Sequence, residues 1–192
     1  MGCVERKQRE KELVRQSILD AALKIAVAEG WHALTIRKIA DAIEYTPPIV
    51  YEHFENKEEL IQELFLSGFR ELQKGYDLKN QSETDPKKII MSLSLNHWDF
   101  AFKHKDLYQL MFSLERPIPN EEMKTGIRLI KNVFMQLANN DEHLAQELMF
   151  NWMCLQSGVI STIIKKALPP GLSKTQPRDL FKSVIERFLN SI

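Results

Sequence analysis

The sequence has few cysteines, the residues whose disulfide bonds stabilise small secreted domains. It contains two cysteines in 192 residues, Cys3 and Cys154, and they lie far apart along the chain. A disulfide framework needs more cysteines than this. A chain of this length also removes about 70% of its unfolded surface from water, so it can build a core without staples. We therefore expect a protein of a reducing compartment, the cytoplasm.

Long apolar runs are also missing. No stretch of about 18 uninterrupted apolar residues occurs, which is the length that a membrane helix needs. Residues 1–12 are rich in charge, whereas a secretory signal needs an apolar segment near its start. The sequence therefore predicts neither a membrane span nor a secretory signal, and it predicts no membrane partner.

An excess of charge of one sign is absent, because 26 basic residues balance 26 acidic ones. This balance excludes a protein that is covered with nucleic acid over its whole surface, but it is compatible with a local basic face. Basic side chains outnumber acidic ones between Arg6 and Arg15. That stretch is either such a face or only the solvated start of a helix.

Signals for β-hairpins are scarce. The chain has seven glycines, and no pair of β-branched runs is joined by Asn-Gly or Asp-Gly. Apolar residues instead recur at helical spacing, for example at Ile36, Ile39 and Ile43. The sequence therefore predicts an all-α fold.

Helix breakers predict how the chain is organised. Asn56 followed by Glu59 is a variant of the capping box and opens a connecting helix of about residues 57–75. Three helices precede it and about five follow it. We divide the chain into a domain of residues 1–56 and a domain of residues 57–192. The later breaks are expected at 76–85, 116–120, 139–141 and 169–177.

The N-terminal domain has the spacing of a helix-turn-helix. Two short helices, about 36–43 and 47–53, are separated by a turn of about three residues and preceded by a longer helix. Thr35 is a natural N-cap of the first. Thr46 is a natural N-cap of the second, because Pro47 holds the residue before it in the extended conformation.

Four short motifs follow one another between residues 18 and 60. They are ILDAA, then G-W-x-x-x-T, then I-A-x-A, and then Y-x-H-F-x-x-K-x-x-L. In these motifs and their spacing the segment resembles the DNA-binding domain of tetracycline-repressor (TetR) family regulators. The resemblance implies a homodimeric transcriptional regulator, usually a repressor, whose C-terminal domain binds a small effector and forms the dimer.

The resemblance and the helix-turn-helix geometry together indicate which side chains contact double-stranded operator DNA. Arg37 is the candidate for reading a base edge, while Tyr51 and Lys57 are candidates for phosphate contacts that fix the register. The full set of candidates is Arg15, Thr35, Arg37, Tyr45, Thr46, Pro47, Pro48, Tyr51, His53 and Lys57.

The turn and the start of the recognition helix depart from the family pattern. Where the family usually has a turn ending in Gly-Val-Ser, this chain has residues 43–46, Ile-Glu-Tyr-Thr. The Lys/Arg-Gly pair that follows is replaced by Pro47-Pro48, which removes two backbone donors. Tyr45 and the Thr46 hydroxyl must therefore do more of the positioning, and contact of Pro47 with a thymine methyl becomes plausible.

The C-terminal region resembles one branch of the family's ligand-binding domains through residues 96–101 and 104–112. Its aromatic side chains suit a flat or apolar effector if a cavity forms between the helices. Ordinary core packing is the alternative for the same residues. The candidates for an effector pocket are Trp98, Phe102, Tyr108, Met111, Phe112 and Trp152.

The last two predicted helices, about 142–167 and 178–190, carry wide apolar faces. Family resemblance makes them the dimer helices, and two such pairs form a four-helix bundle. Completion of a monomeric core is the alternative. The candidate interface residues are Leu148, Trp152, Leu155, Val159, Ile163, Phe181, Val184 and Phe188.

Motifs of enzymes and metal sites are absent from the sequence. It has no Cys-x-x-Cys, no His-Glu-x-x-His and no phosphate-binding glycine loop. His97 and His104 lie two helical turns apart, roughly 10 Å, too far to share a metal unaided. We expect no enzyme, no metal and no cofactor. The alternative to a regulator is a helical ligand carrier or adaptor that has kept the fold without operator binding.

Overall fold

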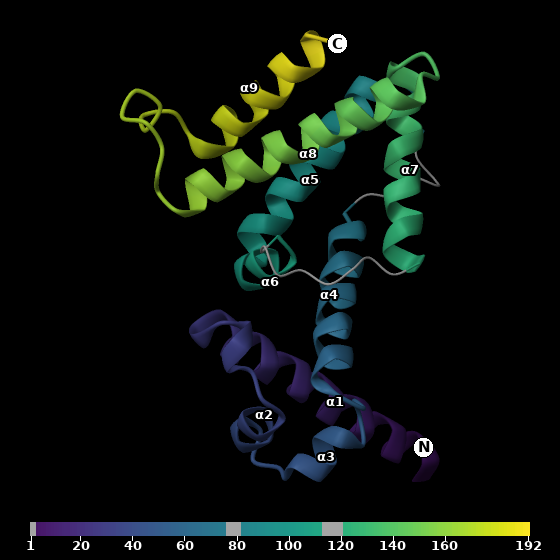
Figure 1. Ribbon diagram of the computed structural model, residues 1–192, viewed down its shortest axis with the longest axis vertical. Helices are drawn as coiled ribbons and strands as arrows, with labels where there is room; N and C mark the ends of the chain where they lie inside the picture. Colours follow the sequence, from purple (N-terminus) through teal and green to yellow (C-terminus); the bar gives the residue numbers. More distant parts are fainter. Residues whose placement is uncertain (1–2, 76–81, 113–120) are drawn as a thin grey trace. The chain divides into compact units, whose positions relative to one another are not determined.

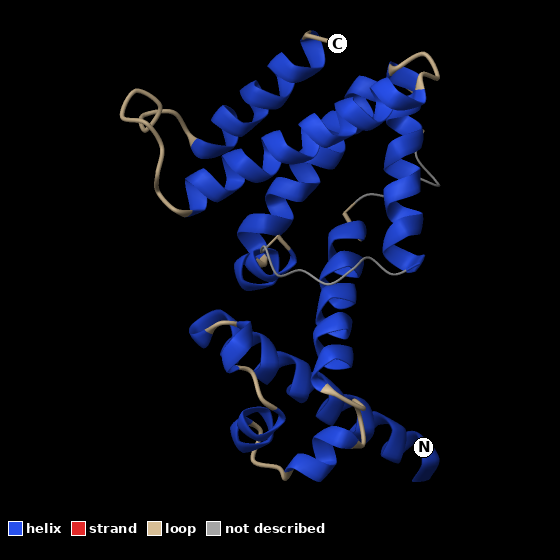
Figure 2. Cartoon of the chain, in the orientation of Figure 1, coloured by secondary structure: helices blue, strands red, loops and turns tan. Residues whose placement is uncertain are grey.

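The computed structural model describes residues 3–75, 82–112 and 121–192, which form helices joined by loops and turns, with no strand among them (Figures 1 and 2). The predicted all-α class is confirmed. Parts of two predicted breaks, 76–81 and 116–120, lie outside the described residues. The helices are α1 (Cys3–Glu29), the 3-10 turn η1 (Trp31–Ala33), α2 (Ile36–Ala42), α3 (Pro47–Tyr51), α4 (Lys57–Gln73), α5 (Pro86–Lys103), α6 (Lys105–Met111), α7 (Glu121–Leu137), α8 (Glu142–Ile164) and α9 (Pro177–Asn190).

The chain forms two compact units. The first unit comprises Met1–Phe69 with Lys105–Pro117, and the second comprises Arg70–His104 with Ile118–Ile192. Helix α4 therefore contributes residues to both units, and α6 belongs to the first. This division differs from the boundary at residue 56 that the sequence suggested, because residues 57–69 at the start of α4 group with the first unit.

The core of the first unit is built by α1, α2, α3 and the first half of α4. Ile18 of α1, Ile39 of α2 and Val50 of α3 are fully buried, and Phe54 after α3 is almost so. Helix α2 packs against both α1 and α3. The apolar spacing read from the sequence thus fixes the two short helices to the long one.

Capping interactions set the helix ends in the first unit. Gly30 ends α1 with a φ of 84°, a left-handed conformation that only glycine adopts without steric cost. The Thr35 hydroxyl accepts a hydrogen bond from the Lys38 backbone N–H at 3.2 Å, as the sequence predicts. The Asn56 side chain accepts from the Glu59 N–H at 2.8 Å, which confirms that α4 starts there.

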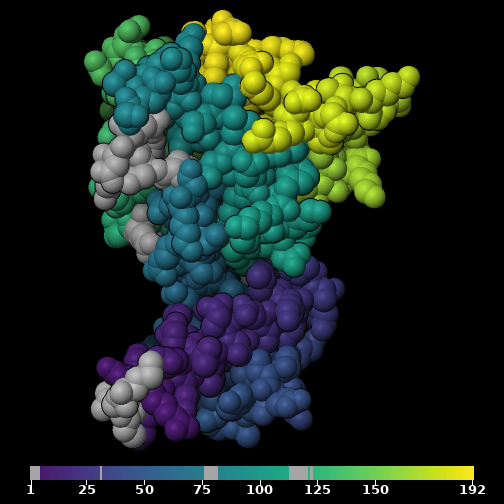
Figure 3. Space-filling model, turned by 180° about the vertical axis from the view of Figure 1, so that it is seen from behind, coloured from purple at the N-terminus to yellow at the C-terminus, as the bar shows by residue number. Residues whose placement is uncertain are grey.

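The second unit is arranged around α5. Helices α7, α8 and α9 all pack against it, and α8 lies beside both α7 and α9 (Figure 1). The Trp98 ring stacks on Phe102 at a centroid distance of 4.2 Å and tilts against Phe181 at 5.0 Å. The connection of α8 to α9, residues 165–176, stands out at the edge of this unit (Figure 3).

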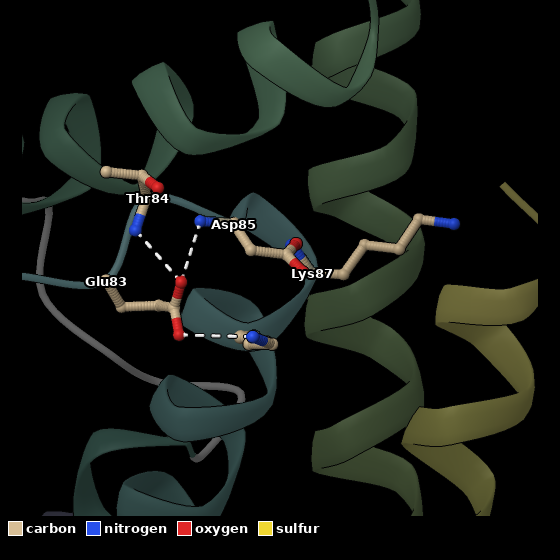
Figure 4. Close-up of polar contacts among 5 residues, drawn as sticks. Glu83, Thr84, Asp85 and Lys87 are labelled. Atoms are coloured by element: carbon tan, nitrogen blue, oxygen red, sulfur yellow. Dashed lines mark hydrogen bonds and ion pairs between the residues drawn. The ribbon is translucent and has the colours of Figure 1, made fainter.

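The start of α5 is fixed by two acidic side chains (Figure 4). Asp85, the residue before Pro86, accepts a hydrogen bond from the Lys87 N–H at 2.9 Å. One oxygen of Glu83 accepts from the N–H groups of Thr84 and Asp85, each at 3.0 Å. The bond to Lys87 satisfies a backbone donor that the helix start leaves without a helical partner, and the bonds from Thr84 and Asp85 fix the chain that leads into the helix.

The end of α4 is tied to α5 within the second unit. The Asn96 side chain donates a hydrogen bond to the Leu72 carbonyl at 2.8 Å. Gly75 lies directly against that amide, and a Cβ at this position would overlap the Asn96 side chain. A glycine is therefore required for α5 to reach the last turn of α4.

Candidate nucleic-acid interface

The turn between α2 and α3 is a Schellman-type helix end. The Tyr45 N–H donates to the Ala40 carbonyl at 3.0 Å, and the Glu44 N–H donates to the Asp41 carbonyl at 3.3 Å. A helix end of this type needs a left-handed backbone at the residue directly after the C-cap. The C-cap is Ile43, and the next residue, Glu44, has a φ of 60°. A glutamate thus occupies the position that usually carries glycine, at a conformational cost.

Helix α3 is short and anchored on one side only. Thr46 is its N-cap, with an extended backbone at φ −95° and ψ 152°, and Pro47 and Pro48 form its first turn. The Thr46 side chain makes no capping hydrogen bond, so its hydroxyl is not used by the helix. Val50 is buried, while the Tyr51 side chain on the outer face is 55% exposed.

Two predicted contact residues lie on α2. Thr35 is exposed, but its hydroxyl already accepts the capping bond from Lys38. Arg37 is exposed, whereas the neighbouring Lys38 forms an ion pair with Glu29 at 2.5 Å. Arg37 makes no ion pair with any of the described residues, and its guanidinium is therefore free to meet an external partner.

Arg15 on α1 is held by contacts inside the first unit. Its guanidinium lies over the Phe54 ring, 4.9 Å from the centroid, and a terminal nitrogen approaches a Glu63 oxygen at 3.5 Å. Neither contact could be predicted from sequence periodicity, because both join residues about 40 or more positions apart. Arg15 thus connects α1 to Phe54, which precedes α4, and to Glu63 of α4.

His53 and Lys57 lie beyond the last turn of α3. His53 is half-buried, and burial together with the Lys11 cation lowers the pKa of His53 below its usual 6.5. Its Nδ1 is buried without a hydrogen-bond partner among the described residues. Lys57 is the first residue of α4 and is half-buried. The neutral imidazole of His53 can donate one hydrogen bond to a phosphate.

A hollow of about 580 Å³ beside α3 was not expected from the sequence. The N-terminal part of α1 forms one wall, where the Leu13 side chain is 63% exposed. The only sequence signal is that Leu13 and Val14 continue the apolar face of α1 upstream of Ile18. The lining residues are Glu10, Lys11, Leu13, Val14, Tyr45, Ile49, Glu52 and His53.

The candidates for an effector pocket fall into both compact units. Trp98, Phe102 and Trp152 belong to the second unit, where the Trp152 indole N–H donates to the Ser94 hydroxyl at 2.8 Å. Tyr108, Met111 and Phe112 belong to the first unit, and the rings of Tyr108 and Phe112 stack at 4.5 Å.

The sequence did not predict that three polar side chains in the second unit are buried. They are Ser94, His97 and Gln156, from α5 and α8. Burial lowers the pKa of His97 to about 4, so the imidazole is neutral near pH 7. No charged side chain is buried among the described residues, which makes this interior polar without being charged.

The predicted interface residues divide into two sets on α8 and α9. Leu148, Trp152 and Phe181 are buried within the chain itself. The others are half-buried and leave apolar surface accessible: Leu155, Val159, Ile163, Val184 and Phe188. The sequence could not separate these sets, since both lie at helical spacing on wide apolar faces.

None of the described helices is long and apolar enough to cross a membrane. In the described part of the chain, no group of three or more His, Cys, Asp or Glu side chains is placed to hold a metal ion.

Residues 18–64 match the family model described as bacterial regulatory proteins, tetR family. This range contains α2, the turn, α3 and the start of α4, and it covers the four motifs that carried the resemblance. The helix-turn-helix geometry therefore lies inside the matched segment.

Two curated regulators are similar in sequence. The HTH-type transcriptional activator FasR of Mycolicibacterium smegmatis is 24% identical over 133 residues, 68% of this chain and 61% of that protein. The uncharacterised HTH-type regulator YobS of Bacillus subtilis is 29% identical over 99 residues, 50% of each chain. The similarity thus spans less than two thirds of the length of either relative.

Solved structures share the fold along most of the chain. The structure of AibR in complex with isovaleryl coenzyme A and operator DNA matches with a TM-score of 0.68 and 14% identity. The match covers 90% of this chain and 96% of that one. At this level of identity the likeness shows a common fold and nothing finer.

Proposed function

We propose that this chain is a transcriptional regulator of the tetR family and that it binds operator DNA with α3 in the major groove. One observation carries the proposal. Helix α3 is anchored by Val50 on its inner side, while Tyr51 is exposed on its outer side and the Thr46 hydroxyl makes no capping hydrogen bond. An anchored short helix with an accessible polar face is what groove recognition requires.

The contact residues take different roles in this proposal. Arg37 reads a base edge, because its guanidinium is exposed and makes no ion pair within the described chain. Tyr45, Thr46, Tyr51, His53 and Lys57 hold phosphates, and Pro47 and Pro48 give apolar contact. Thr35 and Arg15 act mainly by fixing α2 and α1, since their polar groups are already engaged.

We propose further that the protein acts as a homodimer on a palindromic operator. Half-buried apolar side chains on α8 and α9, such as Leu155 and Val184, supply the surface that a partner would cover. Two recognition helices then enter successive major grooves about 34–36 Å apart. Such a regulator works in the cytoplasm, where the chromosomal DNA is.

A small, largely apolar effector is proposed to release the protein from DNA, which makes it a repressor. The solved AibR complex contains both isovaleryl coenzyme A and operator DNA, so one protein of this fold accommodates both kinds of partner. The aromatic cluster of Trp98, Phe102 and Phe181 supplies apolar side chains for contact with such an effector. FasR carries the name of an activator, and the sign of regulation is therefore part of what must be measured.

The test is selection of bound sequences from random DNA duplexes by the purified protein at about 150 mM salt, where nonspecific phosphate binding is weakened. The expected result is an enriched palindrome with half-sites about one helical turn apart. Enrichment of no motif would overturn operator binding and favour a helical ligand carrier or adaptor that has kept the fold.

A further inference from the structure

Three residues on α8 form an exposed stripe, one helical turn apart from each other. They are Phe150, Cys154 and Gly158, at positions i, i+4 and i+8. Phe150 is 64% exposed, the highest value among the exposed large hydrophobic residues described. Cys154 is an exposed free thiol. A phenylalanine exposed to this degree costs free energy in water unless something covers it.

The same stripe ends in a hollow. A Cβ built at Gly158 would meet no atom within 4 Å other than those of its two neighbours and the nearby backbone of its own helix. Around Gly158 lies a hollow of about 360 Å³ between α8, the connection to α9, and α9 itself. Its lining has no charged side chain and includes Leu155, Val159, Leu172 and Val184. The stripe thus presents an aromatic knob at one end and an apolar hole at the other.

The knob and the hole are equally distant from Cys154. If two copies of α8 pack antiparallel about a two-fold axis at Cys154, each residue four positions before it faces the residue four positions after it in the other helix. Phe150 of one copy then lies opposite the hollow over Gly158 of the other. A contact of this kind is self-complementary, as a two-fold interface requires, and it forms twice.

We propose that this stripe is the contact between two copies of the chain, with the two-fold axis at Cys154 and each Phe150 ring inserted over the other copy's Gly158. The inference rests on the proposed homodimer and deepens it by fixing the register of α8. Insertion buries two aromatic rings, each of which covers about 150–250 Å². The absence of charge in the hollow means that no ion must lose its water for the ring to enter.

The register predicts the distance between the two Cys154 residues. Packed helices have axes about 8–10 Å apart, and Cα atoms lie about 2.3 Å from each axis. Residues that face each other at the crossing point therefore have Cα atoms roughly 3.4–5.4 Å apart, which overlaps the range of about 4.4–6.8 Å in which disulfides form.

A knob-and-hole exchange tests the register. In sedimentation equilibrium, Phe150→Ala should raise the dimer Kd about tenfold or more, as expected for a central aromatic residue. Gly158→Phe should also raise it, because the new ring fills the hole. In the double variant F150A/G158F, the new phenylalanine at position 158 of one copy faces the alanine at position 150 of the other. The ring and the space for it are thus exchanged between the two positions, and the Kd should return to within about threefold of wild type.

Leu13→Ala is the matched control, since Leu13 is exposed to the same degree as Phe150 but lies on α1. It should leave the dimer Kd unchanged. The register is overturned if Phe150→Ala has no effect, or if the double variant dimerises as weakly as Gly158→Phe alone. Far-ultraviolet circular dichroism verifies that each variant keeps its helices.

Oxidative cross-linking tests the same register without changing the stripe. In a Cys3→Ser variant, Cys154 is the remaining cysteine. Diamide should convert two Cys154 thiols to one disulfide, taking up the two electrons and two protons that they lose, and a covalent dimer should appear on a nonreducing gel. Adding Cys154→Ser to this variant should abolish the covalent dimer.

The outcomes separate this inference from the proposed function. A wild-type protein that is dimeric and binds its operator, but neither cross-links nor responds to the exchange, contradicts the register alone. A monomeric wild-type protein contradicts both the register and the homodimer. A dimer that cross-links through Cys154 but selects no DNA sequence supports the register and contradicts operator binding.

Discussion

Single residues in the first unit carry both the helix-turn-helix geometry and its departures from the family pattern. Glu44 adopts a left-handed backbone where glycine is usual, and Thr46 precedes two prolines without using its hydroxyl as a cap. The first feature costs conformational energy, whereas the second leaves a polar group accessible.

Replacing Glu44 with glycine should stabilise the protein. A nonglycine residue in the left-handed region costs roughly 1–2 kcal/mol, and part of that gain is lost because glycine makes the unfolded chain more flexible. We expect a net increase of about 0.5–1 kcal/mol in the free energy of unfolding, measured by urea denaturation. Glu52→Gly is the control, since Glu52 has a φ of −68° and the substitution there should destabilise.

Tyr51→Phe should weaken operator binding without changing sequence preference. The variant keeps the ring and loses the hydroxyl that the proposal assigns to a phosphate. Because that hydroxyl is uncharged, the affinity should fall by a similar factor at each salt concentration, and the slope of affinity against salt should stay the same. Arg37→Ala should instead flatten discrimination at one base pair. Fluorescence anisotropy with the selected operator and with single-base variants of it, at two salt concentrations, distinguishes the two substitutions. Equal affinity of Tyr51→Phe and wild type at both salt concentrations would contradict the phosphate contact.

At the scale of the helices, close contacts decide how elements join. Helix α4 ends where the Asn96 amide from α5 binds the Leu72 carbonyl, and this approach depends on Gly75. Helix α8 is joined to α5 by the hydrogen bond from Trp152 to Ser94. Each contact satisfies a polar group that would otherwise be buried without a partner.

Gly75→Ala should therefore destabilise the second unit. The added methyl group would overlap the Asn96 side chain, displace it and leave the Leu72 carbonyl without its partner, which costs about 1–3 kcal/mol. Thermal unfolding followed by circular dichroism should show a lower Tm. Gly171→Ala is the matched control, because nothing lies within 4 Å of a Cβ there, and it should leave the Tm unchanged.

For the whole molecule the net charge is zero, so DNA binding depends on how basic and acidic side chains are distributed over its surface. Basic residues of α1 are partly compensated within the first unit, as in the ion pair of Arg6 with Glu10 at 2.9 Å. The interior of the second unit is polar at His97 but uncharged near pH 7. Stability therefore depends on pH through this residue.

The free energy of unfolding should fall as pH decreases from about 6.5 to about 4. In this range the unfolded chain protonates His97 while the folded chain, whose His97 pKa is lowered to about 4 by burial, does not. Stability is thus fully present above pH 6.5 and is lost below it. Urea denaturation at pH 5 and pH 7 measures the change, which His97→Gln should reduce. An equal pH dependence in that variant would contradict this assignment.

The sequence determined the local structure of this protein. Capping by Thr35 and the helix starts at Pro47 and Lys57 depend on residues within a few positions of each other, and the sequence predicts all three correctly. The family resemblance is equally local, because its motifs occupy 43 consecutive residues, 18–60, inside the segment that the family model matches.

Only the tertiary structure decided which faces are covered. Helical spacing alone could not distinguish the buried Leu148 from the exposed Phe150 two positions on, or show that Arg15 is held by Phe54 and Glu63. Those facts depend on contacts between residues far apart in the chain, where packing and not sequence periodicity sets the environment. The knob at Phe150 and the hollow at Gly158 became visible for the same reason.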